Sequence, residues 1–259
     1  MNPKLLLPLH RARERFVLAA LRALPGPPAR VLDVGCGEGH LHGAIRPLCG
    51  ALDACDLSAA DLWHAALAAP GEPTPRYHVA DAARLPWEDG TFDVVLGLEL
   101  IEHVADARAV LSELARVLRP GGTLILTCPS RHFPFTYDPL HRLAGRRLAG
   151  IGAYAFGHDY LPTESEVRAW LAEVALHDVR CARLTGALAA VTEAYWAGAI
   201  QRVGKANAGN RGTARRSGLR LGQRVPPGLA WVDRLIDLDE RMSAGRPSSV
   251  GLGFVATRA

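Results

Sequence analysis

The sequence lacks the features that mark several other classes of protein. Five cysteines in 259 residues form no C-x-x-C pair, so neither a disulfide framework nor a zinc ribbon is expected. No run approaches the ~18 uninterrupted apolar residues of a membrane span. The apolar residues 5–7 are broken by Pro8 and followed by arginines, which is not the order of a secretory signal. We therefore expect a cytoplasmic chain, soluble or attached only peripherally to a membrane.

Acidic residues are missing from one long segment. Residues 194–232 hold seven Lys or Arg and no Asp or Glu, although the net charge of the whole chain is only +4. Such a segment can be a solvated, arginine-rich surface, or it can bind an anionic lipid surface or RNA. No aromatic residue that could stack on a base lies between Trp196 and Trp231, which disfavours a nucleic-acid partner. Contact with membrane lipid stays open, together with an amphipathic helix expected within residues 1–28.

Strand and helix patterns alternate along the chain. Seven segments read as strands, 31–34, 51–55, 76–80, 92–96, 123–128, 179–184 and 250–257, and the helices are expected at 9–24, 40–48, 58–69, 163–175 and 227–242. This alternation predicts one α/β domain over residues 1–259, with a doubly wound, mostly parallel, Rossmann-like sheet. Residues 186–248 form a basic and helical insertion before the last strand, placed where a lid could lie.

A glycine-rich turn follows the first expected strand. Gly35, Gly37 and Gly39 would let the backbone approach a ligand at the start of a helix. A lone turn of this kind can also be a tight connection and nothing more. Asp56, 17 positions after Gly39, ends the second expected strand, where a carboxylate can accept hydrogen bonds from ribose hydroxyls. Asp81 follows the third expected strand, and the three features together predict a nucleotide site.

The first half of the chain resembles the class I S-adenosylmethionine-dependent methyltransferases, in the group that includes the ubiquinone-biosynthesis O-methyltransferases. The stretches that carry the resemblance are VLDVGCGEG (31–39), CDLS (55–58), DAARLPWEDGTFDVV (81–95), EHV (102–104) and LARVLRPGGTLILTCPS (114–130). The resemblance implies S-adenosylmethionine as the cofactor, held by Asp33, Gly35, Cys36, Gly37, Gly39, Asp56, Leu57, Asp81, Ala82 and Leu98. Asp33 and the 81–95 stretch argue against the rival reading, a NAD-dependent dehydrogenase.

A group of ionisable residues follows the fourth expected strand. If a helix begins near Leu98, then Glu99, Glu102 and His103 share one face of it. Carboxylates and an imidazole are competent ligands for a divalent cation such as Mg²⁺. The pattern resembles two metal-dependent subgroups, the quinone-pathway enzymes and the small-RNA terminal 2′-O-methyltransferases, and this resemblance implies His158 as a further ligand. The alternative is a metal-free site in which His103 and Glu102 act as catalytic groups.

These observations predict an enzyme that moves a methyl group from S-adenosylmethionine to a small-molecule acceptor. The expected acceptor is a hydroxyl, as in a catechol, a quinone precursor, a polyketide or a lipid-like molecule, with or without help from a divalent cation. Two alternatives are an RNA 2′-O-methyltransferase and a non-catalytic interaction module with the nucleotide fold, because a fold alone does not give a substrate.

Overall fold

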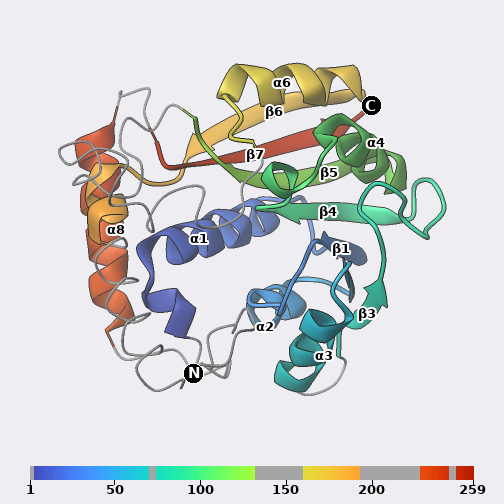
Figure 1. Cartoon of the computed structure of the whole chain (residues 1–259), viewed down its shortest axis with the longest axis horizontal. Helices are drawn as coiled ribbons and strands as arrows, with labels where there is room; N and C mark the ends of the chain where they lie inside the picture. Colours follow the sequence, from blue (N-terminus) through green and yellow to red (C-terminus); the bar gives the residue numbers. More distant parts are fainter. Residues whose placement is uncertain (1–2, 70–73, 132–159, 193–227, 245–248) are drawn as a thin grey trace.

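A computed structural model describes residues 3–69, 74–131, 160–192, 228–244 and 249–259, which are coloured by sequence in Figure 1. Its centre is a seven-stranded sheet in the order β3-β2-β1-β4-β5-β7-β6. The strands are β1 (Arg30–Val34), β2 (Ala51–Asp56), β3 (Arg76–Val79), β4 (Phe92–Leu98), β5 (Leu118–Pro129), β6 (Leu176–Arg183) and β7 (Gly251–Arg258). The first five pair in parallel, whereas β7 runs antiparallel to both β5 and β6. The predicted α/β class, with a mostly parallel sheet of seven strands, is confirmed.

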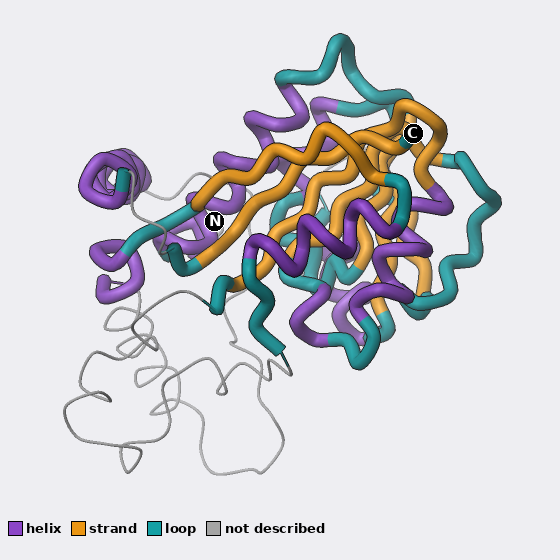
Figure 2. The backbone as a smooth tube through the Cα atoms, turned by 90° about the horizontal axis from the view of Figure 1, so that it is seen from above, coloured by secondary structure: helices purple, strands orange, loops and turns teal. Residues whose placement is uncertain are grey.

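Helices cover both faces of this sheet, as the view from above in Figure 2 shows. The α-helices are α1 (Pro8–Arg22), α2 (His42–Ile45), α3 (Ala59–Ala68), α4 (Ala107–Val117), α6 (Glu164–Glu173) and α8 (Leu229–Ser243), and short 3₁₀ turns lie at Pro3–Leu6, Arg46–Leu48 and Ile101–His103. One apolar core lies between the sheet and α4 and α6. A second core joins the opposite face to α1 and α2. The chain is therefore doubly wound.

The two cores explain why the central strands are apolar without interruption. Side chains alternate between the faces of a strand, so Leu32 enters the core under α4, while Val31 enters the core under α1. In β5, Leu124 and Ile125 divide between the two cores in the same way. Strands buried on both faces read as continuous apolar runs, and such runs made the strands predictable.

Local sequence explains why one helix differs from the expected one and another agrees with it. The helix expected at 40–48 begins only at His42 as α2 and continues as a 3₁₀ turn from Arg46. Pro47 lies in that turn, and its missing N–H and fixed φ do not allow a longer α-helix. By contrast, α6 starts where predicted, because Thr163 and Glu166 form a reciprocal capping box at its first turn.

Helix α1 lies against the sheet and beside α8 (Figure 1). Its apolar face packs onto the sheet, and its contact with α8 combines ion pairs with an apolar contact of Ala12. Arg11 donates two hydrogen bonds to the carboxylate of Asp233, at 2.8 and 3.0 Å. Arg15 reaches Asp237 at 2.6 Å. The predicted amphipathic helix therefore exists, but in this structure its apolar face contacts the sheet.

The predicted insertion before the last strand contains helix α8 and a helical segment over residues 187–192. Residues 193–227, which include the basic residues 202–224, and 245–248 lie outside the described residues. A lid role for residues 186–248 therefore stays a prediction. Among the helices that the structure describes, none has the length and apolar character needed to cross a membrane.

The contact between α1 and α8 gives a first prediction. Asp233→Asn should lower the free energy of unfolding by about 1 kcal/mol, because it removes the charge from a half-buried, two-pronged pair with Arg11. The control is Glu173→Gln, which removes an exposed pair with Arg108 and should cost at most about 0.5 kcal/mol. Urea unfolding curves of the three proteins measure both values. Equal stability of the two variants would contradict the role given to the α1–α8 contact.

Candidate functional site

Four parallel strands, β1 to β4, end at the same edge of the sheet, and a glycine loop follows the first of them. Gly35, Gly37 and Gly39 all have positive φ values, of 72°, 51° and 64°. Other residue types adopt such values only at a cost. The backbone N–H groups of Gly35 and Cys36 both donate to the carbonyl of Cys55, at 2.8 and 3.1 Å. The loop after β1 is therefore held directly against the end of β2.

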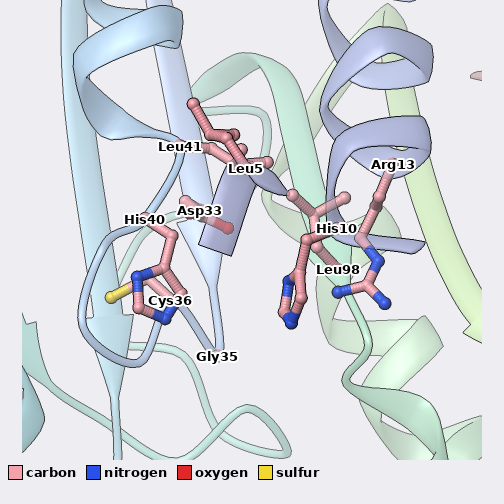
Figure 3. Close-up of a pocket in the computed structure, with 9 residues that line it drawn as sticks. All are labelled: Leu5, His10, Arg13, Asp33, Gly35, Cys36, His40, Leu41 and Leu98. Carbon is pink, nitrogen blue, oxygen red and sulfur yellow. The ribbon is translucent and has the colours of Figure 1, made fainter. Parts of the chain in front are cut away.

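A pocket opens between this loop and α1 (Figure 3). We call it the loop pocket, and its lining residues are Leu5, His10, Arg13, Asp33, Gly35, Cys36, His40, Leu41 and Leu98. Four of the ten residues predicted to hold the cofactor, Asp33, Gly35, Cys36 and Leu98, thus border one cavity. Burial raises the pKa of the Cys36 thiol, and the charge of Asp33 adds to this. The thiol is therefore protonated at neutral pH and acts as an apolar wall.

Six other residues predicted to hold the cofactor lie outside the lining of the loop pocket. Gly37 and Gly39 belong to the glycine loop itself, and the remaining four lie at or just after the ends of β2 and β3. Asp56 ends β2, and its carboxylate accepts hydrogen bonds from the N–H groups of Gly37 and Ser58, at 2.9 and 2.8 Å. Leu57 is 71% exposed. Asp81, also exposed, follows β3 and accepts a hydrogen bond from the N–H of Ala83 at 2.9 Å. Ala82 is buried beside it. These residues line an open edge of the sheet next to the loop pocket.

Three polar residues of the loop pocket were not predicted from the sequence. His10 and Arg13 project from α1 and face Cys36 and His40 of the glycine loop in Figure 3. The rings of His10 and His40 lie edge to face, with their centres 6.5 Å apart. One signal for His10 and Arg13 was present in the sequence, because their spacing places both on one side of a helix. The spacing alone does not show that this helix lies over the ends of the strands.

The predicted arrangement of Glu99, Glu102 and His103 on one helical face is wrong. Strand β4 continues to Leu98, Glu99 turns the chain with a φ of 53°, and only Ile101–His103 forms a 3₁₀ turn. In the described part of the chain, no group of three His, Cys, Asp or Glu side chains is placed to hold a metal ion. His158, the fourth predicted ligand, lies outside the described residues. Glu99 instead pairs with Arg13 of α1 at 2.9 Å.

Glu102 is a fully buried carboxyl group at this edge of the sheet. Neither of its oxygens has a hydrogen-bond partner among the described residues. Burial raises the pKa of Glu102 well above its usual value, and the negative charge of Glu99 raises it further. His103 is more exposed, and its Nε2 lies 3.9 Å from Oε1 of Glu102. An exposed imidazole therefore stands next to a buried carboxyl group.

A second, smaller pocket lies beside the loop pocket and shares Arg13 with it. We call it the edge pocket, and it is lined by Leu9, Arg13, Glu99, Pro129, Leu184, Thr185, Val250 and Gly251. The hydroxyl of Thr185 is buried and has no hydrogen-bond partner in the described structure. Arg13 therefore borders both pockets, and its ion pair with Glu99 lies at the edge pocket, where β5 ends and β7 begins.

Comparison with known proteins identifies this arrangement. The model of a family described as "Methyltransferase domain" matches residues 32–126, from β1 to the middle of β5. The chain is 38% identical over 170 residues to the ubiquinone biosynthesis O-methyltransferase of Xanthomonas campestris pv. campestris (strain B100), covering 62% of this chain and 68% of that protein. The chain belongs to the class I S-adenosylmethionine-dependent methyltransferases. The methyltransferase family and its cofactor, predicted from the glycine loop and the motifs after it, are thereby confirmed.

Solved structures share the fold of this methyltransferase at low sequence identity. The YcgJ protein of Bacillus subtilis has a TM-score of 0.58 and 16% identity, and the match covers 96% of this chain and 99% of that one. A geranyl diphosphate methyltransferase in complex with S-adenosylmethionine has a TM-score of 0.60 and 19% identity, with 96% and 86% covered. At these identities the likeness shows the fold alone.

The buried carboxyl group of the methyltransferase gives a second prediction. Below about pH 3.5, under the ordinary pKa of a glutamic acid, Glu102 is largely protonated in the unfolded chain and in the folded one, so it adds little pH dependence. As the pH rises, the unfolded chain loses this proton while the folded chain retains it, so the wild type loses stability. The melting temperature of Glu102→Gln relative to wild type should therefore rise between pH 5 and pH 8, by about 2–4 °C for each kcal/mol. Thermal unfolding at several pH values measures this difference.

The control for that experiment is Glu173→Gln, since Glu173 is exposed and pairs only with Arg108 among the described residues. Its melting temperature relative to wild type should stay constant over the same pH range. If the curve for Glu102→Gln is equally flat, the pKa of Glu102 is not raised and the carboxyl group is ionised in the folded protein.

Proposed function

We propose that this methyltransferase transfers the methyl group of S-adenosylmethionine to a hydroxyl oxygen of a small molecule, with a catechol or a quinone precursor as the first class to test. The observation that carries the proposal is the 38% identity over 170 residues to an enzyme named as a ubiquinone biosynthesis O-methyltransferase. The family match over residues 32–126 includes both the glycine loop and the Glu102–His103 pair. The pair supports the proposal independently, because a hydroxyl acceptor loses a proton when its oxygen is methylated.

The proposal places the methionine part of the cofactor in the loop pocket. Asp33 would accept a hydrogen bond from the amino group, and Arg13 is the cation available for the carboxylate. The adenosine part would lie over the open edge formed by Asp56, Leu57, Asp81 and Ala82. Since Asp56 already accepts two backbone N–H groups, its carboxylate has a fixed orientation toward the ribose hydroxyls, with lone pairs left to accept from them.

The proposed reaction is an in-line displacement at the methyl carbon. The acceptor oxygen forms a bond to the methyl group, the bond from that carbon to sulfur breaks, and its electron pair stays on sulfur, which leaves S-adenosylhomocysteine. The hydroxyl proton passes to Nε2 of His103 and then to solvent. The buried Glu102 carboxyl group lies 3.9 Å from that nitrogen, which is too far for a hydrogen bond in this state. Glu102 therefore takes no proton in this step and would act only by packing beside His103.

The third prediction tests the acceptor and the base together. Purified protein with S-adenosylmethionine labelled in its methyl group should convert catechols faster than amines of similar size. His103→Ala should lower kcat by about 100-fold or more, while the Kd for S-adenosylhomocysteine should change by less than about twofold, because His103 does not line the loop pocket. The control is His177→Ala, at an exposed histidine of β6, which should leave both values unchanged.

Two results would contradict the proposal. Unchanged turnover in His103→Ala would show that His103 is not the base. Labelled products that carry the methyl group on nitrogen or carbon would show that the acceptor atom is not oxygen. The salt dependence of binding to a short RNA addresses the alternative of an RNA 2′-O-methyltransferase, because phosphate contacts weaken steeply as salt rises. Contact of the basic residues 202–224 with anionic lipid stays a prediction.

Assistance by a divalent cation also stays a prediction. The observation in its favour is the pair of unpartnered, buried oxygens of Glu102. The observation against it is the guanidinium of Arg13, which lies 2.9 Å from Glu99 and would compete with a cation for that carboxylate. Because the described residues do not assemble a ligand set, no step of the proposed reaction is assigned to a metal.

A fourth prediction follows from this competition. If Glu99 and Glu102 can hold Mg²⁺, Arg13→Ala should bind it about tenfold more tightly than wild type, since the guanidinium no longer competes for Glu99. Calorimetric titration with MgCl₂ measures the difference. The control is Arg15→Ala, which loses a pair with Asp237 instead and should bind like wild type. Absence of binding heat in wild type and in Arg13→Ala would show that these carboxylates form no cation site.

A further inference from the structure

A buried chain of polar side chains runs from the loop pocket into the protein interior. It starts at Asp33 of β1, which borders the loop pocket and is 4% exposed. Oδ2 of Asp33 lies 3.0 Å from Nε2 of His42, the first residue of α2. Nδ1 of His42 lies 3.1 Å from the hydroxyl of Tyr77 on β3. His42 itself is 2% exposed, so these two contacts replace water on both of its ring nitrogens.

The chemistry of the groups fixes the direction of the bond to Asp33. An ionised carboxylate only accepts, so Nε2 of His42 carries the proton that Asp33 receives. The Tyr77 hydroxyl lies 3.1 Å from Nδ1 of His42 and 3.3 Å from the carbonyl oxygen of Ala65 in α3, to which it can donate. Burial raises the pKa of Tyr77, which keeps the proton on the hydroxyl. Tyr77 therefore links the ring of His42 to the backbone of α3.

The glycine loop leaves room for this ring. A Cβ atom on Gly39 would lie 2.4 Å from Nδ1 of His42 and 2.8 Å from its Cε1, which is shorter than a non-bonded contact allows. Gly39 also has a positive φ of 64°. The third glycine of the loop thus serves two needs, a backbone conformation and the space that His42 occupies behind Asp33.

We propose that His42, oriented by Tyr77, is a positioning residue that holds the Asp33 carboxylate ready for the amino group of the cofactor's methionine part. One oxygen of Asp33 bonds to His42 and the side chain cannot rotate away from the pocket without losing that bond. The proposal rests on the proposed placement of the cofactor. It assigns to this chain a determinant of cofactor affinity that never contacts the cofactor.

The test compares two ligands that differ in the amino acid part. S-adenosylhomocysteine carries the amino group, whereas 5′-methylthioadenosine lacks the whole amino acid moiety. His42→Leu replaces the imidazole with an apolar side chain of similar size that has no hydrogen-bond donor. It should raise the Kd for S-adenosylhomocysteine by about tenfold. The Kd for 5′-methylthioadenosine should change by less than about twofold. Calorimetry on the full chain measures both.

Three further variants separate positioning from simple packing. His42→Gln can still donate a hydrogen bond from its amide nitrogen, so its Kd for S-adenosylhomocysteine should return to within about threefold of wild type. Tyr77→Phe removes a single oxygen and should raise that Kd by about threefold, with no change for 5′-methylthioadenosine. In an Asp33→Asn background, His42→Leu should have no further effect, because His42 acts through Asp33.

The outcomes distinguish this inference from the proposed placement of the cofactor. Equal weakening of both ligands in His42→Leu and Tyr77→Phe would show that the buried chain only supports the fold, and wild-type affinity in both variants would show that it does nothing for binding. Either result overturns the inference. Failure of Asp33→Asn to weaken S-adenosylhomocysteine would instead overturn the placement of the cofactor, and the role of His42 with it.

Discussion

The carbonyl oxygen of Cys55 is the point on which the site depends. It receives the N–H groups of both Gly35 and Cys36, so the chain leaving β1 must turn at once and pass over the end of β2. Only residues without a side chain follow this path easily, which is why the loop needs glycine at positions of positive φ. The same turn sets Asp33 on one side of the loop and brings Gly37 within reach of Asp56 on the other.

Charges at this edge of the sheet are arranged by burial as much as by pairing. Glu102 is enclosed without a partner among the described residues, whereas Glu99, three residues earlier, is matched by Arg13. Arg13 itself is placed by α1, and α1 is held by the two acidic side chains of α8. The electrostatic environment of the two pockets thus depends on residues more than 200 positions apart in the sequence.

The parts of this structure that could be predicted are those encoded over short stretches of sequence. Apolar runs such as residues 31–34 and 92–96 predicted strands because both faces of the sheet are covered. Asp56 was predicted because it ends a strand next to the glycine loop. The prediction that Glu99 and His103 share one helical face was wrong, because a left-handed turn at Glu99 leaves no pattern in residue spacing. Arg13 and His42 were missed because their importance comes from docking and from a long-range contact with Tyr77.

The antiparallel strand β7 imposes an order on how the molecule can be completed during synthesis. It lies between β5 and β6, and β6 has no other neighbour in the described sheet. Phe16 of α1 also packs against β7 so closely that a Cβ on Gly253 would lie 2.7 Å from its ring. Strand β6 precedes β7 in the sequence and can therefore join the described sheet only after β7 has been made. The packing of Phe16 of α1, the helix that borders the loop pocket, is completed at the same late stage.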